Sequence, residues 1–190
     1  MRRERYGQST QNCKGYCFGS FKKTKNFPKQ VNENFLETVK SEESTQIDVY
    51  IETPAEMDEM WSFCHDKSHQ IWLWWAVDHK TNTPLAYTFG TREYKYLDEL
   101  LELLSEFHVG TVYADNNFAY SSRISSDKLV TGKRNTQQIE RDHLTLRTRI
   151  KRLARKTICF SKSPEIHKTV IGTFINIYFF GRTFDKSLLL

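Results

Sequence analysis

The chain has 190 residues, a mass of 22.5 kDa, 38% apolar residues and a net charge of +5. This length predicts one main domain with a short arm, and the apolar content excludes a wholly disordered chain. The longest apolar run, Ile71 to Val77, is far shorter than the roughly 20 residues that span a bilayer, so we expect no membrane segment. With no apolar signal-peptide core at the start and four scattered cysteines, we expect a cytoplasmic protein with reduced thiols.

Charge is segregated along the chain. Residues 1–30 hold eight bases and one acid, residues 31–120 hold five bases and seventeen acids, and residues 121–168 hold thirteen bases and four acids. Basic segments around an acidic centre suit a protein that binds a polyanion, and clustered acids suit divalent cations. Ordinary solvated surface charge explains the same pattern, so charge alone leaves both interpretations open.

The predicted elements begin after a weakly organised arm. Residues 1–53 are polar and predict an arm or linker with one helix over residues 31–40. Three strands follow over residues 55–63, 71–79 and 85–90, and the turn between the last two makes them antiparallel. The segment between the first two strands contains Cys64, His65 and His69; a turn is favoured there over a metal site.

Helices and strands alternate in the second half of the chain. We predict an amphipathic helix over residues 94–107, a strand over 110–115, a short helix and a brief strand near 128–130. A long basic helix over residues 136–156 carries one apolar stripe, and a final helix begins at Ser163. The residues of the long-helix stripe are Ile139, Leu146, Ile150 and Leu153; those expected to face inward on the final helix are Ile166, Val170, Phe174 and Ile177.

This order predicts an α/β fold with a mixed sheet flanked by helices, the pattern of a ribonuclease-H-like domain. We place that domain at residues 54–182 and a tail at residues 183–190. The four tryptophans, Trp61, Trp72, Trp74 and Trp75, lie in apolar strands, so core packing is favoured over base stacking for them.

Three carboxylates occupy positions that suit metal-dependent chemistry. Asp58 lies within the first strand, Asp115 ends the fourth, and Glu140 lies beside Ile139 on the long helix. Since the first and fourth strands are predicted to be parallel neighbours, the three groups can converge on two Mg²⁺ (or Mn²⁺) ions, as phosphodiester displacement requires. Each carboxylate taken alone is more often a cap or a surface charge.

Basic residues on the long helix are candidate phosphate contacts. Arg147 lies seven residues after Glu140, which returns it to nearly the same helix face. His143, one turn from Glu140, is interpreted as a surface histidine. The further candidates for DNA binding are Arg141, Arg149, Lys151, Arg152, Arg155 and Lys156.

At these residues the chain resembles the transposases of insertion sequence one, a branch of the DDE transposases. The matching segments are AEMDEMWSF, IWLWWAVDH, YADNNFAY and the stretch from Thr136 to Phe180, with Asp115 and Glu140 separated by 25 positions. The resemblance implies that Asp58, Asp115 and Glu140 bind the metal ions and that Arg147 is a catalytic basic residue. It also implies cleavage at transposon ends, 3′-hydroxyl transfer into target DNA, and a homo-oligomer on double-stranded DNA.

The N-terminal region departs from this family's pattern. Members of the family resemble a fusion of a zinc-binding and helix-turn-helix module with the catalytic domain, whereas here only Cys13 and Cys17 suggest a zinc pair. The arm is therefore interpreted as a remnant of a DNA-recognition module. A catalytically inactive DNA-binding fragment is the alternative function, and a stand-alone nuclease of the same fold is a third.

Overall fold

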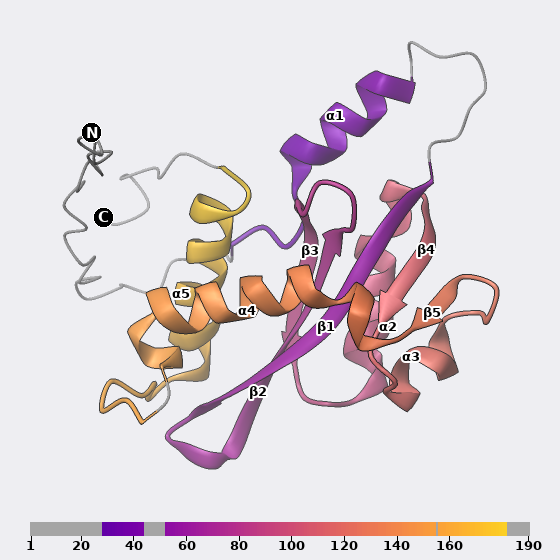
Figure 1. Cartoon of the computed structure of the whole chain (residues 1–190). Helices are drawn as coiled ribbons and strands as arrows, with labels where there is room; N and C mark the ends of the chain where they lie inside the picture. Colours follow the sequence, from indigo (N-terminus) through magenta and orange to yellow (C-terminus); the bar gives the residue numbers. More distant parts are fainter. Residues whose placement is uncertain (1–27, 44–51, 155, 182–190) are drawn as a thin grey trace, which may run out of the picture.

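A mixed five-stranded sheet forms the centre of the protein. The computed structural model describes residues 28–43, 52–154 and 156–181 (Figure 1). The strands are β1 (Thr53–Cys64), β2 (Asp66–Asp78), β3 (Pro84–Gly90), β4 (Val109–Ala114) and β5 (Leu129–Thr131). Their order is β3-β2-β1-β4-β5, with the first three antiparallel and with β4 and β5 parallel to β1. The predicted strands and the ribonuclease-H-like arrangement are confirmed.

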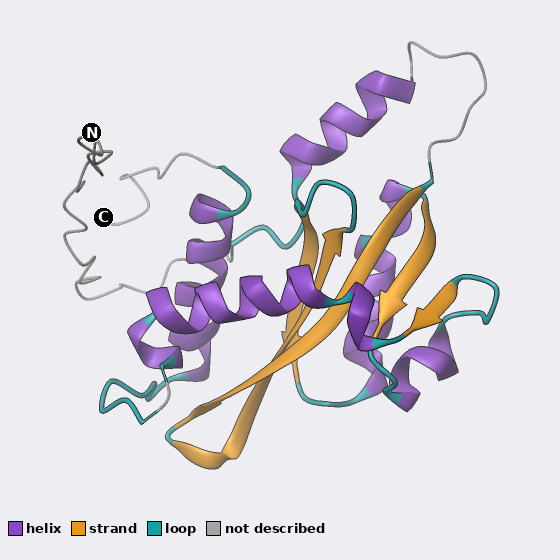
Figure 2. Ribbon diagram, viewed as in Figure 1, coloured by secondary structure: helices purple, strands orange, loops and turns teal. Residues whose placement is uncertain are grey.

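Helices cover both faces of this sheet (Figure 2). They are α1 (Glu33–Glu43), α2 (Tyr94–Leu103), α3 (Phe118–Arg123), α4 (Gln137–Arg149) and α5 (Pro164–Tyr178), with short 3₁₀ turns at Ser105–Phe107, Lys133–Asn135 and Lys151–Leu153. None of the helices in the described ranges is both long and apolar enough to cross a membrane.

Successive side chains of β1 point to opposite faces of the sheet, and a separate hydrophobic core lies on each face. Met57 packs with α2 and α3 residues, whereas Met60 packs with α4 and α5 residues. The same alternation divides two neighbouring tryptophans of β2, because Trp74 joins the first core and Trp75 joins the second. Both indole rings are fully buried. A strand buried on both faces reads as a continuous apolar run, which explains the sequence of β2.

The β1–β2 hairpin reverses direction more tightly than predicted. Cross-strand pairing continues as far as Cys64 opposite Asp66, so most of the segment expected to be a turn is strand. At the hairpin turn, His65 adopts the left-handed conformation, at φ 65°, and its backbone N–H donates to Ser161 O at 2.7 Å. The extra pairing produces a long hairpin (Figure 1), and Cys64 near its tip contacts Ser161, just before α5.

The long basic helix ends earlier than predicted. α4 stops at Arg149 because Ile150 adopts an extended conformation, and a 3₁₀ turn follows. This break directs both Ile150 and Leu153 into the core beside α5, as their apolar character requires. The predicted apolar stripe is therefore confirmed, although the continuous helix that was expected to carry it is not.

The final helix begins as predicted but buries a different face. Ser163 caps α5 by accepting a hydrogen bond from Ile166 N, with Pro164 at the first helical position. Ile166 is 43% exposed, and Ile177 is also exposed, so the predicted inward face is wrong at these two positions. The buried face instead includes His167, which forms hydrogen bonds that make its burial favourable.

Candidate active site

Asp58 lies on β1 beside the end of β4, which Asp115 directly follows. Met57 of β1 pairs with Ala114 of β4 in parallel register, and each aspartate is the next residue along its segment. Neighbouring strands lie about 4.8 Å apart, so the backbones of the two aspartates are adjacent. Asp58 lies on the α4 face of the sheet, as does Tyr113, and Asp115 follows Tyr113 by two residues. The register therefore places these two predicted site residues next to each other in the fold.

Glu56 fixes the first turn of α4 on β1. Its Oε2 accepts a hydrogen bond from Ile139 N at 3.2 Å, and its Oε1 lies 2.6 Å from His79 Nδ1. The Glu56 side chain is 1% exposed. The contact to Ile139 places Glu140 next to the strand that carries Asp58. Sequence reasoning missed this residue, because nothing in the local pattern distinguishes it from other acids of the chain.

His143 contacts Asp58 directly. The two side chains approach within 3.3 Å, from His143 Nδ1 to Asp58 Oδ2. The imidazole is buried against the edge of Trp75, with ring centroids 6.3 Å apart, and its Nε2 atom has no hydrogen-bond partner among the described residues. The prediction of a surface histidine is therefore wrong. The face of α4 that carries His143 packs against the sheet.

Asp142 is a second buried polar group on α4. It is 6% exposed, and its Oδ2 atom has no hydrogen-bond partner in the described part of the chain. Burial is the main cause that raises the pKa of Asp142 to about 6; His143 opposes this rise, and the charge of Glu56 adds to it. The start of α4 thus brings several ionisable groups against the sheet beside Asp58.

Glu140 lies exposed on the first turn of α4, one turn before His143. Across the described ranges, no group of three or more His, Cys, Asp or Glu side chains is close enough to hold a metal ion. The carboxylate oxygens of Asp58, Asp115 and Glu140 nevertheless match the chemistry of Mg²⁺ and Mn²⁺, which prefer oxygen ligands. Asp58 and Asp115 are adjacent in register, whereas among the described residues Glu140 is not brought into a group of three with them.

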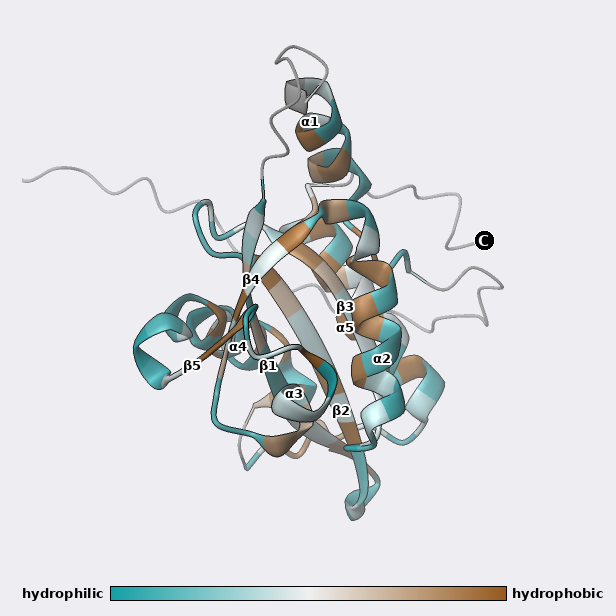
Figure 3. Cartoon of the chain, turned by 90° about the vertical axis from the view of Figure 1, so that its right-hand side faces the viewer, coloured by the Kyte–Doolittle hydropathy of each residue, from teal (hydrophilic) through white to brown (hydrophobic). Residues whose placement is uncertain are grey.

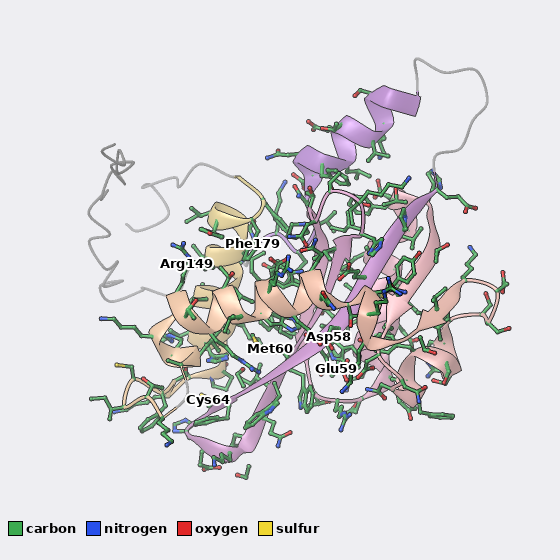
Figure 4. All side chains as sticks on the ribbon, viewed as in Figure 1. Asp58, Glu59, Met60, Cys64, Arg149 and Phe179 are labelled. Atoms are coloured by element: carbon green, nitrogen blue, oxygen red, sulfur yellow. The ribbon has the colours of Figure 1, made fainter. Side chains whose placement is uncertain are left out.

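Glu59 follows Asp58 along β1 (Figure 4), and its side chain lies on the opposite face of the sheet, where it contacts Tyr120 of α3. Its carboxylate accepts hydrogen bonds from Asn117 Nδ2 at 2.6 Å and Tyr120 Oη at 2.8 Å. Burial is the main cause that raises its pKa, and the charges of Asp58 and Asp115 raise it further. Asn117 also donates its backbone N–H to Asp115 Oδ1 at 3.0 Å. This network ties the turn after β4 to β1.

The predicted basic residues differ in what surrounds them. Arg147 is half-buried on α4, about 10.5 Å along the helix from Glu140. Arg152 is half-buried and donates to Ser161 Oγ at 3.3 Å, and burial lowers its pKa. Arg155 lies outside the described residues, as do Cys13 and Cys17. The exposed members of the set are Arg141, Arg149, Lys151 and Lys156.

An open hollow of about 500 Å³ lies beside Asp115. Arg92 and Lys133 bring positive charge to its wall, and Phe118 contributes an aromatic ring that is 70% exposed. The other lining residues are Asn116, Asn117 and Gly132. A strand-end carboxylate at the edge of a cationic hollow is an arrangement that suits a phosphodiester substrate.

Comparison with known proteins establishes the family. Residues 51–181 match the family model of the IS1 transposase. This chain belongs to the IS1 transposase family. It is 55% identical over 126 residues to the insertion element iso-IS1n protein InsB of Shigella dysenteriae, covering 66% of this chain and 96% of that protein. It is 46% identical over 123 residues to the insertion element IS1 protein InsB of Shigella flexneri, covering 65% and 94%.

Two solved structures are similar at low sequence identity. One is a simian T-cell lymphotropic virus intasome in complex with PP2A regulatory subunit B56 gamma, with 14% identity and a TM-score of 0.46 over 74% of this chain and 54% of that chain. The other is the HTLV-2 integrase catalytic core domain in complex with magnesium, with 12% identity and a TM-score of 0.41 over 65% and 83%.

Loss of the Glu56 carboxylate is expected to destabilise this IS1 transposase domain. Glu56→Leu leaves Ile139 N and His79 without their acceptor, which should lower the free energy of unfolding by about 2–3 kcal/mol. Glu56→Gln retains an acceptor oxygen and should lose less. Urea denaturation measures both, with the exposed Glu37→Leu as control. Equal stability of Glu56→Leu and the wild type would contradict the proposed role.

Proposed function

We propose that this chain is the catalytic part of a transposase that cuts DNA at the ends of an insertion sequence and joins the freed 3′-hydroxyl ends to target DNA. The observation that carries the proposal is the adjacency of Asp58 and Asp115 on β1 and β4. Membership of the IS1 transposase family supports a DNA substrate. The buried contacts around Glu56 support a defined position for Glu140 over the two aspartates.

The proposed roles of the residues follow from their positions. Asp58, Asp115 and Glu140 hold two Mg²⁺ or Mn²⁺ ions, which when bound supply Lewis acidity and lower the pKa of water at the scissile phosphate. His143 orients the Asp58 carboxylate through their 3.3 Å contact. Arg147 is placed two turns along α4 from Glu140, where its guanidinium can bind a phosphate oxygen.

The exposed bases bind the DNA outside the site itself. Arg149, Lys151 and Lys156 extend the positive charge from the end of α4 into the following segment. Arg141 lies beside Glu140 and forms a hydrogen bond to Gln138 Oε1 at 3.2 Å. These side chains are proposed to contact phosphates and so to hold the duplex in register without reading its sequence.

Assembly and domain roles belong to the same proposal. Transposition acts at two ends of one element, so we propose that a homo-oligomer forms on double-stranded DNA. Residues 54–182 form the catalytic domain, residues 1–53 contribute a basic arm that strengthens DNA binding, and residues 183–190 form a tail.

The proposal is tested with the full chain and a labelled duplex that carries one end of the element. In Mg²⁺ or Mn²⁺ we expect nicking at the end and joining to a second duplex, both measured on denaturing gels. Excess chelator should remove both products. Undiminished activity in chelator would overturn the proposal; cleavage without joining would indicate a nuclease, and salt-sensitive binding without cleavage would indicate an inactive DNA-binding fragment.

A further inference from the structure

Two tryptophans of the hairpin lie at the surface, unlike the two in the cores. Trp61 of β1 and Trp72 of β2 are directly opposite each other in the antiparallel register. Trp61 is 41% exposed and Trp72 is half-buried, whereas the indoles of Trp74 and Trp75 are completely buried. The preference for core packing, stated from sequence for all four, is therefore wrong for Trp61.

Trp61 lies beyond the part of the sheet that α2 and α3 cover, and Trp72 packs against the edge of the first core. Along β1 the side chains on this face are Met57, Glu59, Trp61 and Phe63 in turn, and only the first belongs to the core. The far end of the hairpin extends past both helices in Figure 3. The rings of Trp61 and Phe63 lie 6.3 Å apart, so the aromatic surface continues from Trp61 toward the end of the hairpin.

A cation connects this aromatic surface to the candidate active site. The Arg92 guanidinium lies 5.1 Å from the centroid of the Trp72 ring, and its Nη2 is 4.0 Å from Glu59 Oε1. Its side chain is 63% exposed. Arg92 also lines the hollow that contains Asp115. We call the three aromatic residues Trp61, Phe63 and Trp72, together with the stacked Arg92, the aromatic strip. Because Arg92 also lines the hollow, the strip and the hollow form one continuous surface.

We propose that the aromatic strip binds an unpaired DNA strand next to the cleavage site by stacking on its bases. The inference rests on the proposed function, because it names the form of DNA that this site holds. Indole rings and a stacked guanidinium suit nucleobases of any sequence, and a nearby cation suits the backbone phosphate. Arg92 and Lys133 supply that charge within the same hollow as Asp115.

Charge and continuity favour DNA over a protein partner on this surface. A purely apolar protein interface would not require the Arg92 guanidinium, which lies over the Trp72 indole at the edge of a cationic hollow. Phe118, 70% exposed, provides a further stacking surface on the Asp115 side of the hollow. The strip lies on the face of the sheet opposite Asp58, and it reaches the site through the hollow at the end of β4, where Arg92 and Phe118 lie beside Asp115.

The test measures DNA binding without cleavage. The full chain is titrated in chelator with a fluorescent 12-nucleotide single strand and, separately, with the matching duplex. We expect Trp61→Ala to weaken single-strand binding about 10-fold and to change duplex binding less than about twofold. Trp61→Phe retains a stacking ring and should stay close to the wild type. Phe160→Ala removes an exposed aromatic residue outside the strip and serves as the matched control.

The outcomes separate this proposal from the proposed function. Thermal unfolding of each variant establishes that the fold is retained, and binding in chelator does not depend on catalysis. Unchanged single-strand binding by Trp61→Ala would overturn the inference even if the wild type cleaves DNA. Equal losses for Trp61→Ala and Phe160→Ala would overturn it too. A change in sedimentation of Trp61→Ala without a change in DNA binding would identify the strip as a protein interface instead.

Discussion

Replacing Asp58 by asparagine is expected to abolish DNA cleavage and joining while leaving the domain folded. Asparagine has nearly the same shape, and its side-chain oxygen can still accept the hydrogen bond that Glu59 N donates at 2.9 Å. It lacks the negative charge that a divalent cation requires. Loss of groups that merely support metal ligands costs 10–100-fold in activity or affinity, so loss of a direct ligand should cost at least about 100-fold.

The control for Asp58→Asn is a carboxylate of no proposed function. Glu102 is exposed on α2, and Glu102→Gln removes the same charge without touching the site. We expect its cleavage rate to match the wild type. Gel assays in Mg²⁺ give the rates, and urea denaturation gives the stabilities. Wild-type rates for Asp58→Asn would show that this carboxylate is not part of the chemistry.

The sequence was sufficient to predict that two of the three carboxylates lie together. The order of strands and helices, which is typical of a ribonuclease-H-like sheet, predicts that β1 and β4 are parallel neighbours, and the observed register makes Asp58 and Asp115 adjacent. These patterns are local, because the apolar residues within each strand are enough to predict that strand. The position of Glu140 beside the buried Ile139 follows in the same way from helical spacing.

The groups that support the site were not predictable, because their contacts join distant parts of the chain. Glu56 contacts Ile139 across 83 residues, and Glu59 contacts Tyr120 across 61. In both pairs, the local sequence around one residue does not indicate that it contacts the other. His143 was misassigned for a related reason: its polar character suggests the surface, and only the docking of α4 on β1 reveals that it is buried beside Asp58.

The buried histidine of α5 shows how tertiary contacts override an apolar pattern. Sequence periodicity favours Ile166 and Ile177 as inward residues, yet both are exposed. His167 takes the core position because two hydroxyl groups satisfy its ring: Ser62 Oγ lies 2.8 Å from Nε2 and Ser161 Oγ lies 2.7 Å from Nδ1. A polar residue with both nitrogens paired can be buried at little cost, so the helix rotates to include it.

The stability of the domain is expected to depend on His167 in mildly acidic solution. Burial is the main cause that lowers its pKa from 6.5 to about 4, and the charges of Arg152 and Lys168 contribute to this shift. The unfolded chain then binds a proton between pH 6.5 and 4 that the folded chain does not. The contribution of neutral His167 is therefore complete above pH 6.5 and falls as the pH drops to 4, by about 3 kcal/mol in total.

Comparison of variants isolates this effect from other titrating groups. Asp142 and Glu59 have raised pKa values and so change stability in the opposite direction as the pH falls, but they titrate equally in wild type and variant. His167→Gln should unfold more easily at pH 7 because the two serine contacts are weakened. The difference in unfolding free energy between wild type and His167→Gln should shrink steadily as the pH falls from 6.5 to 4.

Urea denaturation at half-unit pH steps measures that difference. His65→Asn is the control, because His65 is exposed and asparagine tolerates its left-handed backbone at φ 65°. Its difference from the wild type should stay nearly constant over the same range. A constant difference for His167→Gln would show that His167 is not held neutral in the fold, and its pairing with Ser62 and Ser161 would then need a protonated ring, in which both nitrogens donate.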